Sequence, residues 1–242
     1  MPGIRRLLGE ISSKLVKEAT PKDSWLIKKL DDSLAAIPNR QSSGGVFYPS
    51  SLGSKCDRFL YYHYRGLIPQ EPISAKLRRI FDHGNVTQDR YQKYFEKLRV
   101  LISCELQLKY SNPPISGRAD FILQYADEEG KKDPITGIIR YTFENYILEF
   151  KTINDTGFKK LTKATPDHEA QLQCYLNIAN LTKGGVLYEN KDNQDLKLFS
   201  TERNVEWWNT ILDRCRKVMN LQIPPEIVEP HDKYCKCLLV KG

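Results

Sequence analysis

The hydrophobic positions in the first hundred residues follow a helical period. Near the N-terminus, aliphatic residues recur on one helical face at Ile4, Leu7, Leu8, Ile11 and Leu15. Further helices are predicted over about residues 22–36, 49–66 and 73–98. Pro38 and the run from Gln41 to Gly45 interrupt the pattern, which indicates a loop. We therefore expect a helical extension over residues 1–45 and one further domain over residues 46–242.

After residue 100 the pattern changes to that of strands. Strands are predicted over about residues 100–110, 117–125, 146–150, 184–189 and 196–199. A charged turn is predicted over about residues 127–133, and helices over about residues 166–180 and 201–219. The chain thus begins with helices and continues with a block of strands that contains one helix. This order predicts an α/β domain with helical additions.

Composition adds a preference for polyanions. The chain of 242 residues has 37 lysines and arginines against 30 acidic residues, and its formal net charge is +7. A basic balance favours contact with nucleic acid.

The sequence has no apolar run of membrane-spanning length and no apolar signal segment. We therefore expect a cytoplasmic protein without membrane contact. It would be associated with the nucleoid or, if it is viral, lie in the host cytoplasm. Disulfides between its six cysteines are not expected there.

Two predicted strands carry acidic residues among apolar ones. Glu149 and Lys151 alternate along one strand and therefore share a face, and Asp120 lies on another strand. Two carboxylates, with the peptide carbonyl of Phe150, offer the oxygen ligands that Mg²⁺ or Mn²⁺ prefers. Such a site with a lysine suits phosphodiester hydrolysis. The alternative is an ordinary edge strand with a cross-strand ion pair.

A third segment, which contains Gln171 and Tyr175, extends this pattern to one that resembles a known family. Gly117-Arg118-Ala119-Asp120, then Glu149-Phe150-Lys151, are followed about twenty residues later by Gln171 and Tyr175, four positions apart on a predicted helix. This order resembles the PD-(D/E)xK nuclease superfamily, and most closely its RecB-like branch, which includes CRISPR-associated and phage-encoded exonucleases. The resemblance implies a restriction-endonuclease-like core, in which a central mixed β-sheet is flanked by helices.

The same resemblance implies a function. It implies a Mg²⁺- or Mn²⁺-dependent DNA exonuclease of recombination, repair or replication, acting on single strands or duplex ends beside other proteins of those processes. Its catalytic residues would be Asp120, Glu149, Lys151, Gln171 and Tyr175. Contact with the DNA backbone is expected from Arg118, Arg90, Lys159 and Lys160.

One position departs from the family. The branch carries Gly-x-x-x-His on an upstream helix, whereas this chain has Gly84 followed by Gln88. The glutamine offers a neutral carbonyl oxygen as a metal ligand, and His83 is the nearest histidine. The departure keeps a second hypothesis open, a catalytically weak DNA-binding or scaffold module of the same fold. A structure-specific endonuclease is a third.

A second metal site is indicated near the C-terminus. In relatives of this branch, one early and three late cysteines bind a [4Fe–4S] cluster. Here Cys56 matches the early position, and His231, Cys235 and Cys237 complete a set of four zinc ligands. Cys215 could instead complete a four-thiolate site for zinc or an iron–sulfur cluster. The remaining alternative is reduced, unpaired thiols.

Overall fold

The computed structural model describes residues 24–39, 44–126, 131–140, 142–229 and 231–240. The predicted helical face from Ile4 to Leu15 lies outside these residues. The chain divides into two compact units, one of residues 1–41 and 70–83 and the other of residues 42–69 and 84–242. Within the described part of the chain, no helix combines the length and the apolar character needed to cross a membrane.

The first unit contains helix α2 (Ser24–Ala35) and the beginning of helix α5 (Ala75–Lys97). Both helices were predicted from the sequence. In this unit Arg79 forms an ion pair with Asp31, and Arg78 donates to the carbonyl of Ile37. These contacts join the start of α5 to α2 and the segment after it.

The second unit is built on a mixed sheet of five strands in the order β1-β2-β5-β6-β7. Its strands are β1 (Leu101–Tyr110), β2 (Ile115–Ala126), β5 (Phe143–Ile153), β6 (Lys183–Asn190) and β7 (Leu196–Glu202). Strands β5 and β6 are parallel, and the other pairs are antiparallel. Two-residue strands β3 (Lys131–Lys132) and β4 (Ile139–Arg140) pair with each other, and β3 lies within the predicted charged turn of residues 127–133.

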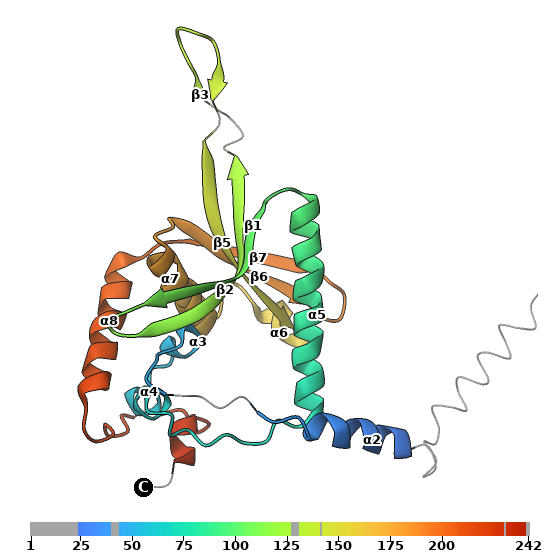
Figure 1. The fold of residues 1–242 in the computed structure, drawn as a ribbon, viewed down its shortest axis with the longest axis vertical. Helices are drawn as coiled ribbons and strands as arrows, with labels where there is room; N and C mark the ends of the chain where they lie inside the picture. The colour runs from blue at the N-terminus through green and yellow to red at the C-terminus, as the bar shows by residue number, and fades with distance from the viewer. Residues whose placement is uncertain (1–23, 40–43, 127–130, 141, 230, 241–242) are drawn as a thin grey trace, which may run out of the picture. The chain divides into compact units, whose positions relative to one another are not determined.

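Helices cover both faces of this sheet (Figure 1). Helix α7 (Pro166–Ala179) packs Leu172 and Leu176 against one face, together with Ile147 and Val186 of the strands. On the other face, the part of α5 in this unit packs Tyr91 and Phe95 against the aromatic and aliphatic side chains of Phe121, Leu148, Phe150 and Leu187. Alternate strand residues thus enter two separate cores, because successive side chains point to opposite faces.

The remaining helices of the second unit are α3 (Pro49–Leu52), α4 (Asp57–Tyr64), α6 (Asp155–Lys160), α8 (Val205–Asn220) and the 3-10 helix η1 (Lys236–Leu239). A third core joins α4, α8 and η1 through residues such as Leu60, Leu212 and Cys237. The five-stranded sheet with helices on both faces confirms the predicted α/β fold class.

Several elements differ from the predictions. Residues 49–66 form two short helices, and the chain between Leu52 and Asp57 breaks them apart. Helix α6 was not predicted. The last helix begins at Val205 because β7 extends to Glu202, and the side chain of Asn204 then accepts a hydrogen bond from the N–H of Trp207 as an N-cap.

Candidate active site

Strands β2 and β5 pair as far as Phe121 and Leu148 and then separate. One further step of this antiparallel register would place Asp120 opposite Glu149. At that step the N–H of Asp120 donates to Oε1 of Glu149 at 3.3 Å, and the N–H of Phe150 donates to Oδ2 of Asp120 at 2.8 Å. Each carboxylate is therefore held by the main chain of the neighbouring strand, in the gap where the strands diverge.

Lys151 completes this group. Its Nζ lies 3.0 Å from Oε2 of Glu149 and 3.7 Å from Oδ2 of Asp120. The side chain of Glu149 has no exposed surface, and that of Asp120 is 14% exposed. The structure thus brings the three residues of the sequence pattern together, with two carboxylates sharing a single ammonium.

Burial dominates the ionisation of this group. The pKa of Glu149 is raised to about 8, because burial, and to a smaller extent the charge of Asp120, outweigh the lowering effect of Lys151. Burial likewise raises the pKa of Asp120. Burial alone would lower the pKa of Lys151, but the two carboxylates raise it above its ordinary value. One ammonium therefore does not compensate two buried carboxylates, and a divalent cation would.

Helix α7 supplies two further side chains. Nε2 of Gln171 donates to Oε2 of Glu149 at 2.8 Å and lies 3.3 Å from the hydroxyl of Tyr175. The hydroxyl of Thr165 accepts a hydrogen bond from the N–H of His168, which starts the helix at Pro166 and sets this register. Gln171 consequently contacts the carboxylate of Glu149, and Tyr175 contacts Gln171 on the same face of the helix.

The glycine of the Gly117-Arg118-Ala119-Asp120 motif makes room for this contact. A Cβ atom on Gly117 would lie 2.8 Å from the hydroxyl of Tyr175 and 2.9 Å from ring carbons of Pro49. Any larger residue would therefore push α3 or Tyr175 away from β2.

Glu105 is a residue near the site that the sequence pattern did not reveal. It lies on β1 where the register with β2 would place it opposite Asp120, and its charge raises the pKa of Asp120. Its backbone has a φ of 51°, a left-handed conformation uncommon for a residue with a side chain. Only the strand register brings Glu105 close, so its position in the sequence carries no signal.

His168 was missed as well. Its Nδ1 lies 2.7 Å from the hydroxyl oxygen of Tyr188, which also accepts a hydrogen bond from the N–H of Thr165. Burial, and then the charge of Lys151, lower the pKa of His168 to about 4. A neutral histidine therefore lies near the ammonium of Lys151. Its place one turn before Gln171 was the available signal.

The predicted metal ligand Gln88 makes a different contact. Its Nε2 donates to Oε1 of Glu105 at 2.7 Å, so it approaches the carboxylates through Glu105. Arg118 also forms an ion pair with Glu105, at 2.9 Å. Gln88 and Arg118 therefore both contact Glu105 of β1, the strand next to the one that carries Asp120.

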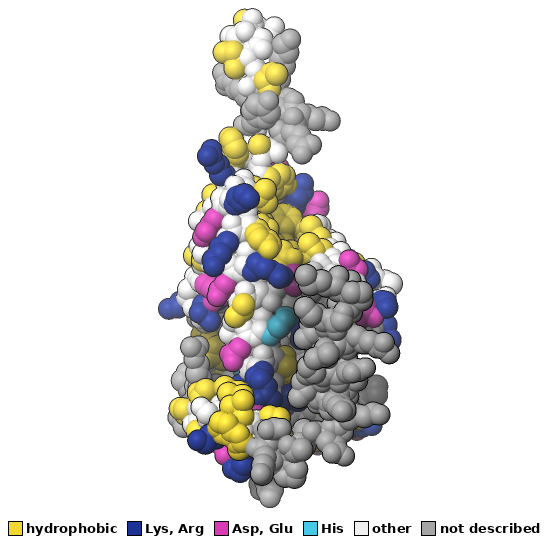
Figure 2. All heavy atoms as spheres, turned by 90° about the vertical axis from the view of Figure 1, so that its right-hand side faces the viewer, with side chains coloured by type: hydrophobic (Ala, Val, Ile, Leu, Met, Phe, Trp, Pro, Cys, Tyr) yellow, Lys and Arg dark blue, Asp and Glu magenta, His cyan; other side chains and the backbone are white. Residues whose placement is uncertain are grey.

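The other residues predicted to contact DNA have intramolecular partners or are exposed. Arg90 forms an ion pair with the buried Glu189, whose carboxylate also accepts from the hydroxyl of Tyr91. Lys159 pairs with Asp155 within α6, and Lys160 is exposed. On the described part of the face drawn in Figure 2, lysine and arginine side chains are interleaved with acidic ones.

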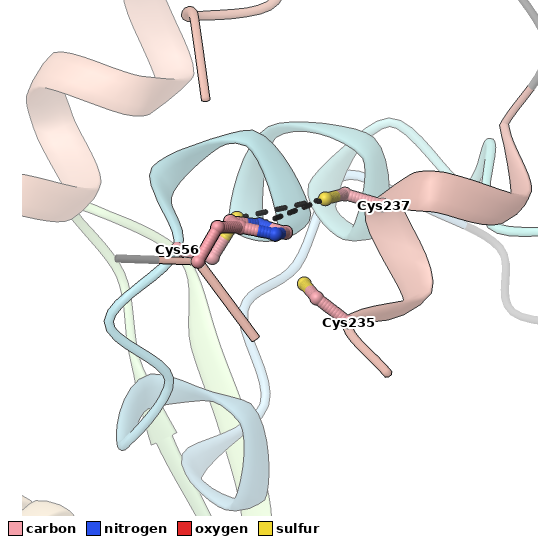
Figure 3. A group of neighbouring side chains, drawn as sticks. Cys56, Cys235 and Cys237 are labelled. Carbon is pink, nitrogen blue, oxygen red and sulfur yellow. Dashed lines mark hydrogen bonds between the residues drawn. The ribbon is translucent and has the colours of Figure 1, made fainter. Parts of the chain in front are cut away.

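The predicted second set of metal ligands also converges. The ligand atoms of Cys56, His231, Cys235 and Cys237 all lie within 4.8 Å of one another. Figure 3 shows the three cysteines meeting from the start of α4 and from η1. Cys215, the predicted substitute ligand, is not among these four residues and is buried in the core that also contains Cys174.

Comparison with known proteins finds solved structures with a similar fold but identifies no family to which this chain belongs. No family model matches the chain, and no curated protein matches its sequence. The solved structure of SSO0001 matches with a TM-score of 0.50 at 18% identity, over 92% of this chain and 96% of that one. An alkaline exonuclease from Laribacter hongkongensis, LHK-Exo, matches with a TM-score of 0.48 at 11% identity, over 79% and 90%. Its complex with dAMP matches at 0.47 and 14%, over 72% and 86%.

The likeness to SSO0001 concerns the fold alone, because so few residues are identical. The strand order and the helices on both faces of the sheet are those of a restriction-endonuclease-like α/β core.

Proposed function

We propose that this chain is a metal-dependent nuclease that hydrolyses phosphodiester bonds in DNA. The observation that carries the proposal is the meeting of Asp120, Glu149 and Lys151 where β2 and β5 separate. Two buried carboxylates beside one ammonium, at an opening in a sheet, have no evident structural benefit, since burying an uncompensated charge is costly.

The donors in this gap fit a hard divalent cation. Asp120 and Glu149 offer carboxylate oxygens, and the N–H of Phe150 already points into the gap toward Asp120. Because the N–H and C=O of one strand residue point to the same side, the carbonyl of Phe150 faces the gap too. Oxygen ligands of this kind favour Mg²⁺ or Mn²⁺. When bound, such a cation supplies Lewis-acid polarisation of a phosphoryl oxygen.

The side chains around the gap have separate tasks. Lys151 places a positive charge beside the carboxylates, where it stabilises negative charge that develops on the phosphate. Gln171 holds Oε2 of Glu149 and thereby leaves the carboxylate one orientation. Tyr175 fills the space between α7 and β2 next to Gly117.

We infer that the substrate is DNA and that cleavage proceeds from an end. The resemblance of the sequence motifs to RecB-like exonucleases and the net charge of +7 support this choice. Arg118 and Lys160, which are exposed, are the proposed contacts to phosphates, and such contacts would weaken as salt rises. Recombination, repair or replication is the proposed setting.

The test is cleavage of end-labelled single- and double-stranded DNA with Mg²⁺ and with Mn²⁺. Asp120→Asn, Glu149→Gln and Lys151→Met should each abolish cleavage, whereas Asp213→Asn, at an exposed residue paired with Arg216, should cleave like the parent. Parental cleavage by any of the three site variants would refute the site. Cleavage of circular single-stranded DNA would replace the exonuclease with an endonuclease.

Gln88 supports one rival, a DNA-binding or scaffold module with weak catalysis. It stands where the family has a histidine, and it bonds to Glu105. Isothermal titration with Mn²⁺ separates the two functions. DNA binding without Mn²⁺ binding and without cleavage would establish the module and refute the nuclease.

A further inference from the structure

Four side chains far apart in the sequence meet beside helix α4. Cys56 is the residue that precedes the helix, and His231, Cys235 and Cys237 come from the C-terminal segment. Sγ of Cys56 lies 3.7 Å from Sγ of Cys237, and Nε2 of His231 lies 3.3 Å and 3.4 Å from these two sulfurs. The sulfur of Cys235 lies within 4.8 Å of the other three ligand atoms.

The three separations among Cys56, Cys237 and His231 are close to the edges expected for a tetrahedron of ligands around one ion. With Zn–S bonds of about 2.3 Å and Zn–N bonds of about 2.0–2.1 Å, tetrahedral angles give edges of about 3.8 Å between sulfurs and about 3.6 Å between sulfur and nitrogen. The three printed separations, 3.7, 3.3 and 3.4 Å, differ from these edges by only a few tenths of an ångström. We infer that Cys56, His231, Cys235 and Cys237 bind a single zinc ion.

An iron–sulfur cluster does not fit the same residues. In a [4Fe–4S] cluster each protein ligand binds a different iron atom, so the ligands surround a whole cluster and lie farther apart than ligands of one ion. This chain brings together three thiols and an imidazole within 4.8 Å of one another, and Cys215 is not in this group. The four residues therefore fit a mononuclear site better than a cluster.

The surroundings favour a bound thiolate and a closed site. Sγ of Cys56 accepts the N–H of Phe59 at 3.2 Å, at the positive end of α4. Cys237 is 2% exposed and packs in the core of α4 and α8, and Cys235 packs against the same core. Four protein ligands with no open position are typical of structural zinc, not of catalytic zinc.

The ion would join parts of the chain that are 175 and 181 residues apart. Helices η1 and α4 also contribute to one shared core, which contains Leu60 and Cys237. Zinc binding would therefore contribute directly to the folding of the C-terminal segment onto α4, because the site does not exist in the unfolded chain.

The experiment is elemental analysis of the full-length protein, followed by exchange of its metal for Co²⁺. We expect about one zinc per chain and, after exchange, the visible spectrum of tetrahedral cobalt with thiolate charge-transfer bands. Stoichiometric iron and sulfide would overturn the inference. Protein without metal that yields an octahedral cobalt spectrum would overturn it as well.

Variants locate the ion. Cys235→Ser and His231→Ala should lose most of the zinc and unfold at a lower temperature, whereas His231→Cys, which restores a fourth ligand, should retain it. Cys104→Ala, at a cysteine outside the group, is the matched control for losing a thiol. Glu149→Gln should keep its zinc, so a failure of the proposed nuclease would leave this result unaffected. Zinc retained by both Cys235→Ser and His231→Ala would refute the site.

Discussion

Gln171 on α7 donates a hydrogen bond of 2.8 Å to Oε2 of Glu149 on β5. The same oxygen lies 3.0 Å from Nζ of Lys151, so one carboxylate oxygen is held by an amide and an ammonium. Oε1 accepts the N–H of Asp120 on β2. Residues of three elements, β2, β5 and α7, thus fix the orientation of the Glu149 carboxylate.

Replacing Gln171 with alanine should lower activity more than stability. The loss of the amide frees one lone pair of Glu149 while Lys151 remains, and removal of a group that orients a metal ligand typically costs about 10–100-fold in activity or metal affinity. Cleavage rates at several Mn²⁺ concentrations and a thermal unfolding curve measure both effects. Gln92→Ala is the control, because Gln92 is half-buried and its amide bonds to Glu96 within α5. Equal activity of the two variants would contradict the proposed role of Gln171.

The stability of the protein should depend on pH through Glu149 when no Mg²⁺ or Mn²⁺ is added. Its pKa is about 8 in the folded protein against an ordinary 4.5, so between these values the folded state binds more protons than the unfolded state. The free energy of unfolding therefore falls as pH rises through this window. His168 has the opposite sign between its folded pKa of about 4 and its ordinary 6.5, so above pH 6.5 its contribution is largely complete while that of Glu149 continues to 8.

Thermal unfolding between pH 6.5 and 8 tests this expectation. The midpoint should fall more steeply with pH in the parent than in Glu149→Gln, and saturating Mn²⁺ should remove the difference, because the cation replaces the proton. Parallel curves for the parent and the variant, without Mn²⁺, would show that Glu149 does not titrate there.

Glu105 should strengthen metal binding by its charge. Glu105→Gln keeps an oxygen for the hydrogen bond from Gln88 but removes the charge that acts on Asp120. We expect the Mn²⁺ concentration for half-maximal cleavage to rise about fivefold, as for a loss of roughly 1 kcal/mol between partly exposed charges. Glu96→Gln removes an acid from α5 and should leave this concentration unchanged. An unchanged value in Glu105→Gln would limit Glu105 to a structural role.

Two glycines should respond oppositely to alanine. Gly117→Ala places a methyl group against Pro49 and Tyr175, which overpacks the contact and should destabilise the protein by about 1–3 kcal/mol. A Cβ atom on Gly84, within α5, meets no atom within 4 Å, so Gly84→Ala should stabilise the helix by up to about 1 kcal/mol. Chemical denaturation measures both. Stabilisation by Gly117→Ala would mean that β2 and α7 are not in close contact.

The sequence by itself determined most of the elements and the identity of the central residues. Alternation placed Glu149 and Lys151 on one face of a strand, and the spacing of Gln171 and Tyr175 placed both on one face of a helix. These are local regularities of one element, so they can be read without knowing what the element packs against. The ends of α8 and the break between α3 and α4 were less predictable, because capping and packing decide them.

Only the tertiary structure decided which residues of other elements lie next to Asp120, Glu149 and Lys151. The strand register brings Glu105 beside Asp120, and the seating of α7 on the sheet brings His168 near Lys151. The same is true of the separation of β2 and β5, which opens the gap that Asp120 and Glu149 fill. Register and helix seating depend on contacts between residues distant in the chain, and no periodicity within a single element contains that information.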